Sequence, residues 1–179
     1  MQIRKAVPAD IPAIADTYKR LLTYELQHGT RSNWKLNVYP TAEVPEKAVP
    51  AGTMYVLTDD GKICASMILN HEQAPEYAGI HWNCGADPEK VLVIHTLCIP
   101  PDKAGHGYGS AMVRFAEDFA VRTGCKCIRI DTWAHNEPAQ HLYEKFGFKT
   151  VGFGQIRLHG LIDEEQVYME HCLPGSKSE

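Results

Sequence analysis

The sequence predicts a single mixed α/β domain with a central sheet of about seven strands flanked by helices. Its length of 179 residues suits one domain with room for a hydrophobic core. Runs rich in β-branched residues alternate with amphipathic helical runs, without repeats or linkers. The run VLVIHTLCI at residues 91–99 is almost continuously apolar, as in a strand buried on both faces. We expect the domain to cover residues 1–173, with a C-terminal tail at residues 174–179.

Composition and charge argue against several classes of partner. The net charge of −4 provides no electrostatic footprint for nucleic acid, so no nucleic-acid partner is expected. No apolar run approaches about 18 residues and the N-terminus lacks a signal-peptide pattern, so we expect no membrane partner and a cytoplasmic location. The six cysteines lie mostly in apolar or strand-like runs, as free cytoplasmic thiols do. Cys125 and Cys127 form C-x-C rather than C-x-x-C, so no metal site is predicted.

Local patterns predict the elements of the N-terminal part. Residues 3–7 form a short strand, and apolar residues that recur with helical spacing from Ile11 predict a helix. Asp10 is the expected N-cap, because its carboxylate can accept from the first free N–H groups of a helix. A loop at residues 28–40 and a short helix at residues 41–49 follow.

The middle of the chain is predicted to be a hairpin followed by a loop. The β-rich runs at residues 53–59 and 62–70 are joined by Asp60-Gly61, a strong two-residue turn signal. A second long loop, at residues 71–90, then leads into the buried strand.

The C-terminal part is predicted to hold two helices and three strands. In chain order these are a helix with its apolar face at residues 111–120, a strand at 127–133, a helix at 136–147, and strands at 149–156 and 165–173. Gly124 ends the first helix. Asn136 is the expected N-cap of the second helix, with Pro138 in its first turn and Gly147 at its end.

Three glycines, Gly105, Gly107 and Gly109, lie in the stretch KAGHGYGSAM between the buried strand and the next helix. Backbone N–H groups at the start of a helix are unpaired and the helix dipole favours negative charge, so this turn favours an anion such as phosphate. The spacing matches neither the P-loop nor the dinucleotide-binding fingerprint. A tight turn that needs only positive φ angles is the alternative.

Two separate motifs, LCIPPDKAGHGYGSAM and IRIDTWAHNEPAQHLYEKFGF, together resemble the GCN5-related N-acetyltransferase (GNAT) family. The resemblance covers residues 91–153 well, and the N-terminal half only by the order of its elements. It implies the fold of that family, in which the sheet is splayed between the fourth and fifth strands. It also implies acetyl-CoA as cosubstrate and no metal.

The resemblance implies that the glycine turn binds the pyrophosphate of coenzyme A. The family's loop, Gln/Arg-x-x-Gly-x-Gly/Ala, falls on Ala104, Gly107 and Gly109. Ala104 departs from it, because it lacks a long polar side chain, and Lys103 or His106 is a candidate substitute. The residues implied in coenzyme binding here are Ala104, Gly105, His106, Gly107, Tyr108, Gly109 and Ser110.

The strand before the turn is assigned by the same resemblance. Its exposed backbone at Leu97, Cys98 and Ile99 is expected to pair with the pantetheine arm of the coenzyme. A backbone N–H there would stabilise the oxyanion that forms when an amine attacks the thioester. Cys98 as an acyl-carrying nucleophile is the alternative, which the buried character of the strand disfavours.

One face of the second helix carries Asn136, Ala139, Gln140 and Tyr143, at positions i, i+3, i+4 and i+7. Taken alone, Tyr143 could be a core residue whose hydroxyl finds a partner. The resemblance implies instead that Tyr143 protonates the departing thiolate and that Asn136 and Ala139 contact the coenzyme. A phenol with a pKa of about 10 is protonated at neutral pH and can donate this proton.

His95 on the buried strand is the first candidate for the base that deprotonates the acceptor amine. A simple alkylamine has a pKa of about 10.4, so little of it is the free nucleophile at neutral pH. A histidine pKa of about 6.5 suits general-base catalysis. A buried neutral histidine is the alternative, and His81, Glu72 and Asp131 are weaker candidates.

These expectations combine into an acetyl-CoA-dependent N-acetyltransferase that acts on a primary amine of a small molecule by direct attack in a ternary complex. The acceptor wall is expected in residues 24–50 and 71–90. Candidates there are acidic residues that could attract a cationic amine (Glu72, Glu76, Asp87, Glu89) and aromatic residues that line a pocket or anchor loops (Trp34, Tyr39, Trp82). The alternatives are a protein or peptide amine as acceptor, a non-catalytic acyl-CoA-binding sensor on the same fold, and a nucleotide-binding α/β domain. A homodimer is common in the family.

Overall fold

The computed structural model describes residues 1–158 and 160–174. The strands are β1 (Gln2–Lys5), β2 (Met54–Asp59), β3 (Lys62–Asn70), β4 (Val91–Cys98), β5 (Cys127–Trp133), β6 (Lys149–Leu158) and β7 (Ile162–Cys172). The helices are α1 (Ile11–His28), α2 (Glu43–Ala48), α3 (Tyr108–Arg122) and α4 (Glu137–Glu144). Of the tail expected at residues 174–179, only Pro174 lies within the described residues.

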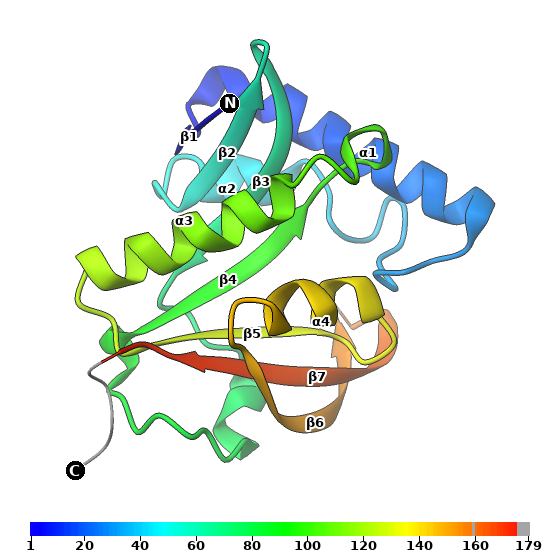
Figure 1. Cartoon of the computed structure of the whole chain (residues 1–179). Coiled ribbons are helices and arrows are strands. Elements are labelled where there is room, and N and C mark those ends of the chain that lie inside the picture. The colour runs from blue at the N-terminus through cyan, green and yellow to red at the C-terminus, as the bar shows by residue number, and fades with distance from the viewer. Residues whose placement is uncertain (159, 175–179) are drawn as a thin grey trace.

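The strands form one seven-stranded sheet in the order β1-β2-β3-β4-β5-β7-β6. Neighbouring strands are antiparallel except β4 and β5, which are parallel. These two strands pair only from Val91–Cys127 to Val93–Arg129, and from there they diverge (Figure 1). The single α/β domain, its mixed sheet and the splay between the fourth and fifth strands are therefore confirmed.

Helices cover both faces of this sheet, with α3 and α4 on one face and α1 and α2 on the other (Figure 1). Side-chain alternation along β2 gives the reason: Tyr55 and Leu57 pack on the α3 side, whereas Met54 and Val56 pack on the α1 side. The loop at residues 71–90 covers the rest of the second face. Within the two described ranges, no helix has the length and apolarity needed to span a membrane.

Most predicted boundaries agree with the structure, and the hairpin turn is confirmed. Asp60 and Gly61 both have positive φ angles, 47° and 72°, as a tight two-residue hairpin turn requires. Strands β6 and β7 are longer than predicted and pair from Lys149–Glu170 to Leu158–Ile162. Ladder hydrogen bonds extend through their polar ends, which carry no hydrophobic signal in the sequence.

Asp10 is the N-cap residue of α1, as predicted, but its side chain makes no capping hydrogen bond to the helix. A 3₁₀ turn precedes the helix, and the Asp10 carboxylate accepts from the Val7 backbone N–H at 2.8 Å and from the Arg4 guanidinium at 2.6 Å. The hydrogen bond from Arg4 holds the pKa of Asp10 below its usual value. Asp10 thus closes the turn that leads into α1 and ties it to β1.

Candidate active site

Strand β4 has a bulge where it leaves β5. The register between β3 and β4 shifts between Ser66 and Ile68, where β4 has one extra residue. Thr96 lies in this bulge with a φ of 50°, a strained conformation for a β-branched side chain. Its hydroxyl is hydrogen-bonded to the Tyr39 hydroxyl at 2.6 Å. This contact ties the bulge to the loop that follows α1.

The splay exposes the edge of β4 to a cavity. Beyond Val93, in the described part of the chain, β4 has no strand partner on its β5 side. Leu97 and Ile99 line a cavity of about 350 Å³ between α4 and the C-terminal half of α1, which contributes Leu21 and Tyr24. A free strand edge offers N–H and C=O groups to an extended ligand. The β4 backbone at Leu97 and Ile99 is therefore accessible for the predicted pairing with the pantetheine arm.

The Cys98 side chain faces the opposite way. It is fully buried in the cluster that holds Ile14 of α1 and Met54 of β2, and it is not part of the cavity wall. Burial raises the pKa of its thiol to about 12, so very little thiolate forms at neutral pH. Both observations disfavour Cys98 as a nucleophile, while the coenzyme contact predicted for its backbone stays a prediction.

The glycine turn provides a row of free donors at the start of α3. Gly105 and Gly107 have φ angles of 79° and 77°, and Gly107 is the N-cap residue of the helix. Within the described residues, the backbone N–H groups from Gly105 to Ser110 have no hydrogen-bond acceptor. Successive free donors at a helix N-terminus form a site for an anion.

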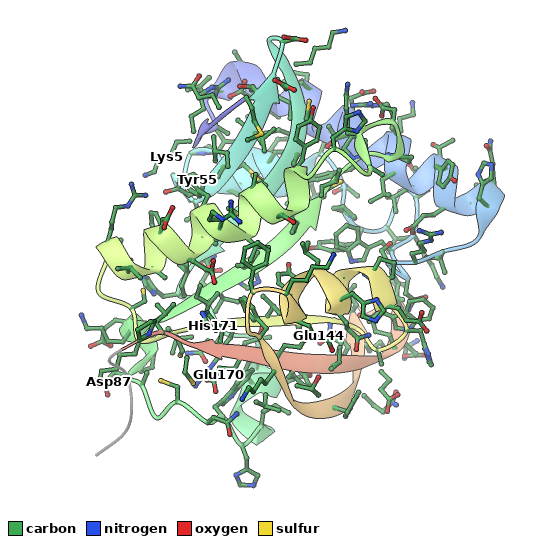
Figure 2. The ribbon with its side chains drawn as sticks, in the orientation of Figure 1. Lys5, Tyr55, Asp87, Glu144, Glu170 and His171 are labelled. Atoms are coloured by element: carbon green, nitrogen blue, oxygen red, sulfur yellow. The ribbon has the colours of Figure 1, made fainter. Side chains whose placement is uncertain are left out.

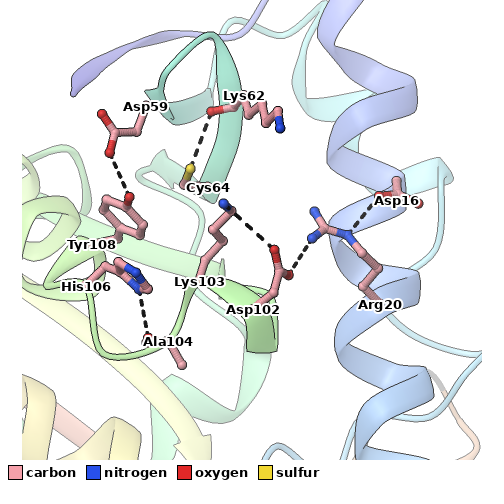
Figure 3. Close-up of polar contacts among 10 residues, drawn as sticks. All are labelled: Asp16, Arg20, Asp59, Lys62, Cys64, Asp102, Lys103, Ala104, His106 and Tyr108. Carbon is pink, nitrogen blue, oxygen red and sulfur yellow. Dashed lines mark hydrogen bonds and ion pairs between the residues drawn. The ribbon is translucent and has the colours of Figure 1, made fainter.

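The aromatic side chains of the turn hold it in place (Figure 3). The Tyr108 hydroxyl donates to Asp59 at 2.8 Å. The His106 ring stacks on Tyr108, with ring centroids 5.5 Å apart, and its Nδ1 lies 2.9 Å from the Ala104 carbonyl oxygen. Their side chains are thus engaged within the protein, which leaves the backbone of these residues for the predicted coenzyme contact.

Gly109 differs from the other two glycines. A Cβ at Gly109 would lie 3.0 Å from Leu142 and 3.1 Å from Ile99, whereas a Cβ at Gly105 or Gly107 would meet no atom within 4 Å. Gly109 therefore allows the start of α3 to pack closely against α4 and the end of β4. The sequence motif does not distinguish this packing role from the role of an anion site.

Helix α4 begins as predicted at Asn136. Its Oδ1 accepts from the Ala139 backbone N–H at 3.3 Å, and its Nδ2 donates to the Thr132 hydroxyl at 3.2 Å. Asn136 and Ala139 both line the 350 Å³ cavity. The side chains on the opposite side of the helix, among them Glu144 (Figure 2), are exposed.

Tyr143 of α4 lines the same cavity. The residue is 5% exposed, and its ring packs on Phe148 with centroids 5.2 Å apart. No hydrogen bond to its hydroxyl exists within the described residues, and burial raises its pKa. The hydroxyl is therefore available to a ligand that enters this cavity.

A second cavity, of about 270 Å³, meets the first at the splay. The two share walls formed by Thr96, Asp131 and Asn136. Gln166 also lines the second cavity, and it shares one face of β7 with Tyr168, which packs opposite α3 and α4. Two ligands, one in each cavity, could therefore contact each other at the gap between β4 and β5.

Three carboxylates, from Glu76, Asp131 and Glu164, line the second cavity, and we call them the acidic wall. Burial raises the pKa of both Asp131 and Glu164. Arg157 lines the cavity too, but its side chain is 66% exposed and pairs with Asp163 at 3.3 Å. The acidic wall thus favours a cationic ligand.

His95 also lines the second cavity. Its Nε2 lies 2.9 Å from Asn70 Oδ1, which accepts from the Glu72 backbone N–H as well. Nε2 therefore donates, and Nδ1 is the basic atom of the neutral ring. Burial lowers the pKa of His95, opposed by the charge of Asp131. The ring is thus neutral at pH 7, as a general base must be, and this role stays a prediction.

Of the three aromatic residues expected in the acceptor wall, two line the second cavity and one does not. Trp34 and Tyr39 line the second cavity. Trp82 anchors its loop instead: its ring lies 4.1 Å from the Arg129 guanidinium, which pairs with Glu170 of β7 (Figure 2).

Four other candidates lie outside the walls of both cavities: Glu72, His81, Asp87 and Glu89. Figure 2 shows Asp87 near the paired ends of β4 and β5, away from the end where these strands diverge. Sequence reasoning missed Glu164. The one sequence feature that could have indicated Glu164 is its position in a strand, on the same face as Gln166 and Tyr168.

Three features define the class of protein as an acyltransferase. They are the sheet that opens between the parallel strands β4 and β5, the anion site that follows β4, and Tyr143 beside the gap. The chain belongs to the acetyltransferase (GNAT) family, whose model matches residues 15–148. Proteins of this family use acetyl-CoA as the acetyl donor.

Comparison with known proteins agrees with this membership. The chain is 30% identical over 61 residues to the uncharacterized N-acetyltransferase YhfO of Bacillus subtilis, which covers 34% of this chain and 41% of that protein. It is 28% identical over 96 residues to a streptothricin acetyltransferase of Escherichia coli, covering 53% and 52%. These matches thus span about half, or less, of the curated relatives.

Solved structures share the fold along almost the whole chain. An acetyltransferase of the GNAT family from Streptococcus agalactiae superposes with a TM-score of 0.75 at 19% identity, covering 96% of this chain and 95% of that one. The protein YncA from Salmonella typhimurium, solved with its cofactor acetyl-CoA, gives a TM-score of 0.69 at 16% identity, covering 99% of this chain and 96% of that one.

Proposed function

We propose that the chain is an acetyl-CoA-dependent N-acetyltransferase that acylates a primary amine of a small molecule by direct attack in a ternary complex. The observation that carries the proposal is the meeting of two cavities at the splay. One holds the free hydroxyl of Tyr143, and the other holds the acidic wall and His95. Thioester and amine can then meet at the gap between β4 and β5, which both cavities border. The buried Cys98 supports direct transfer over an acyl-enzyme.

The residues present fit acetyl-CoA as a substrate. The free N–H groups of Gly105 to Ser110 would bind the pyrophosphate. The unpaired edge of β4 at Leu97 and Ile99 would bind the amide groups of the pantetheine arm. A backbone N–H of this edge would donate to the thioester oxygen as its negative charge grows, which lowers the barrier to attack.

Tyr143 is the proposed general acid. Its raised pKa keeps the proton on the phenol oxygen until the carbon–sulfur bond breaks. The leaving thiolate, with a pKa of about 8.5 for a simple thiol, then takes this proton.

An assay over a panel of amines tests the proposed function. Coupled detection of free thiol and mass-spectrometric detection of the acetylated amine are both needed, because the chain has six cysteines of its own, including the exposed Cys172. We expect turnover of at least one small primary amine. Binding of acetyl-CoA without turnover of any small amine or peptide would support a sensor instead. Stabilisation by ATP but not by coenzyme A would support a nucleotide-binding domain.

The pH profile tests His95 as the base. We expect kcat/KM for total amine to rise with pH through the lowered pKa of His95, below about 6.5, and then to stay level up to the amine pKa of about 10. The plateau arises because neutral His95 can take the proton of the bound ammonium ion.

The variant His95→Gln should lose this plateau, because it can use only the free amine. Its kcat/KM should climb about tenfold per pH unit up to the amine pKa. A plateau that survives in His95→Gln would show that another group is the base.

The variant Ala104→Arg is expected to bind coenzyme A about tenfold more tightly, because an added guanidinium can make a charge-assisted contact with the pyrophosphate. The cations already nearby are engaged, since Lys103 pairs with Asp102, which also pairs with Arg20 (Figure 3). Calorimetric titration measures the change, with Ala104→Met as an uncharged control of similar length. Equal affinities would mean that the turn already compensates or that the motif is misplaced by one residue.

A further inference from the structure

We infer that Tyr39 is a positioning residue: its hydroxyl holds Thr96 in the left-handed conformation and thereby fixes the direction of the Leu97 backbone N–H at the splay. This inference rests on the proposed function and specifies how the oxyanion donor on β4 is held in place. Tyr39 belongs to the segment at residues 29–40, which we call the acceptor loop because it lines the second cavity.

Thr96 has an exceptional backbone conformation. Its φ of 50° is one that a β-branched residue rarely adopts, because Cβ then crowds the neighbouring backbone. The other non-glycine residues with positive φ in the two described ranges are Asn33, Asn37 and Asp60, which are residue types that tolerate it. Strain of this kind persists where the surrounding structure holds it. A specific contact that holds Thr96 is therefore expected.

The conformation of Thr96 decides where the next peptide group points. Because each peptide unit is planar, the direction of the Leu97 N–H relative to the preceding strand depends on the backbone dihedral angles of Thr96. The register between β3 and β4 places Thr96 and Leu97 together opposite one residue of β3. An extended Thr96 would remove this bulge and turn the Leu97 N–H away from its present direction.

The Tyr39 hydroxyl makes the contact that holds Thr96. It lies 2.6 Å from the Thr96 hydroxyl, and Thr96 is 8% exposed, so little water competes for this hydrogen bond. Burial raises the pKa of Tyr39, which keeps the proton on its phenol oxygen. Threonine is stiff about its single χ1 angle, so fixing its hydroxyl also restrains the backbone that carries it.

The acceptor loop is itself anchored, so that Tyr39 is held in place. The Tyr39 ring packs edge-to-face on Trp34, with ring centroids 5.7 Å apart. Asn33 of the same loop donates to Glu164 of β7 at 2.9 Å. Trp34 and Tyr39 both line the second cavity, so an acceptor bound there would contact the residue that holds the bulge. Tyr39 thus links acceptor binding to the geometry of the thioester site.

Single-turnover rates test the inference with Tyr39→Phe, which removes the hydroxyl and keeps the ring on Trp34. We expect the rate of acetyl transfer to fall about 10- to 100-fold, because a catalytic group displaced by about 1 Å loses up to about 100-fold in rate. The apparent affinity for the amine should change little, since the ring remains in the cavity wall. Tyr55→Phe is the control, because Tyr55 (Figure 2) is a buried tyrosine outside the walls of both cavities. A full rate for Tyr39→Phe would overturn the inference.

Substitutions of Thr96 separate positioning from packing. Thr96→Val keeps the shape of the side chain and loses the hydrogen bond, so it should be as slow as Tyr39→Phe. Thr96→Gly loses the side chain, but glycine adopts a φ of 50° without strain, so it should recover part of the lost rate. In the Thr96→Gly background, Tyr39→Phe should have no further effect, since the two residues act through one contact. A slower Thr96→Gly than Thr96→Val, or an undiminished effect of Tyr39→Phe in that background, would overturn the inference.

A measurement without turnover separates the inference from the proposed function. Leucine-selective isotope labelling for NMR follows the Leu97 amide in the free protein. Tyr39→Phe should shift or broaden this signal, whereas Tyr55→Phe should not. An unperturbed Leu97 amide in Tyr39→Phe would overturn the inference. A perturbed Leu97 amide in a protein that acetylates no amine would contradict the proposed function and leave the positioning role of Tyr39 standing.

Discussion

The substitution Tyr143→Phe is expected to lower kcat by about 100-fold or more while the Kd of acetyl-CoA stays nearly unchanged. The change removes only the hydroxyl, which has no protein partner among the described residues, and leaves the ring against Phe148. Without the phenol, the thiolate must leave unprotonated or take its proton from water.

The assay must be limited by chemistry, so single-turnover mixing of preformed enzyme and acetyl-CoA with amine is the appropriate measurement. Tyr168→Phe is a matched control, because the Tyr168 hydroxyl is also buried and unpaired in the described structure but lies outside the walls of both cavities. We expect the control to turn over normally. Normal single-turnover rates for Tyr143→Phe would remove Tyr143 as the acid.

The substitution Gly107→Val is expected to weaken coenzyme binding by about 100-fold or more. Gly107 has a φ of 77°, a left-handed conformation that costs a non-glycine residue about 1–2 kcal/mol. The new side chain would also fill the open space over the free N–H groups. Backbone strain and obstruction therefore act in the same direction.

Calorimetric titration with coenzyme A measures this loss, and circular dichroism verifies the fold. Gly61→Val is the matched control, because Gly61 has a φ of 72° and equally open surroundings, but lies in the β2–β3 turn. The control should lose some stability and keep its affinity for coenzyme A. A folded Gly107→Val protein with normal affinity would contradict the assignment of the glycine turn.

The elements around the candidate site were predictable because their signals are local. The N-cap of α4 at Asn136, the left-handed Gly107 and the strand at residues 127–133 all follow from neighbouring residues. The absence of a side-chain capping bond at Asp10 has a local cause as well, since a 3₁₀ turn competes with the helix for the same carboxylate. The packing role of Gly109 could not be predicted from local sequence. Its closest neighbours are Leu142, which is distant in sequence, and Ile99, which lies before the turn.

The acceptor side could not be predicted in the same way. Its contacts join residues that are far apart in the chain: Asn33 meets Glu164 across 131 positions, and Tyr39 meets Thr96 across 57. The order of strands, which inserts β7 between β5 and β6, places Glu164 and Gln166 beside the splay. No periodicity along the sequence encodes these neighbours.

The sequence by itself determined the α/β class, the glycine turn, the helix that bears Tyr143 and the resemblance to one family, because backbone propensity and side-chain periodicity act over a few residues. Only the tertiary structure decided that Thr96 forms the bulge and that two cavities meet there beside an acidic wall. The physical reason is that burial, strain and uncompensated charge depend on which distant strands pack together.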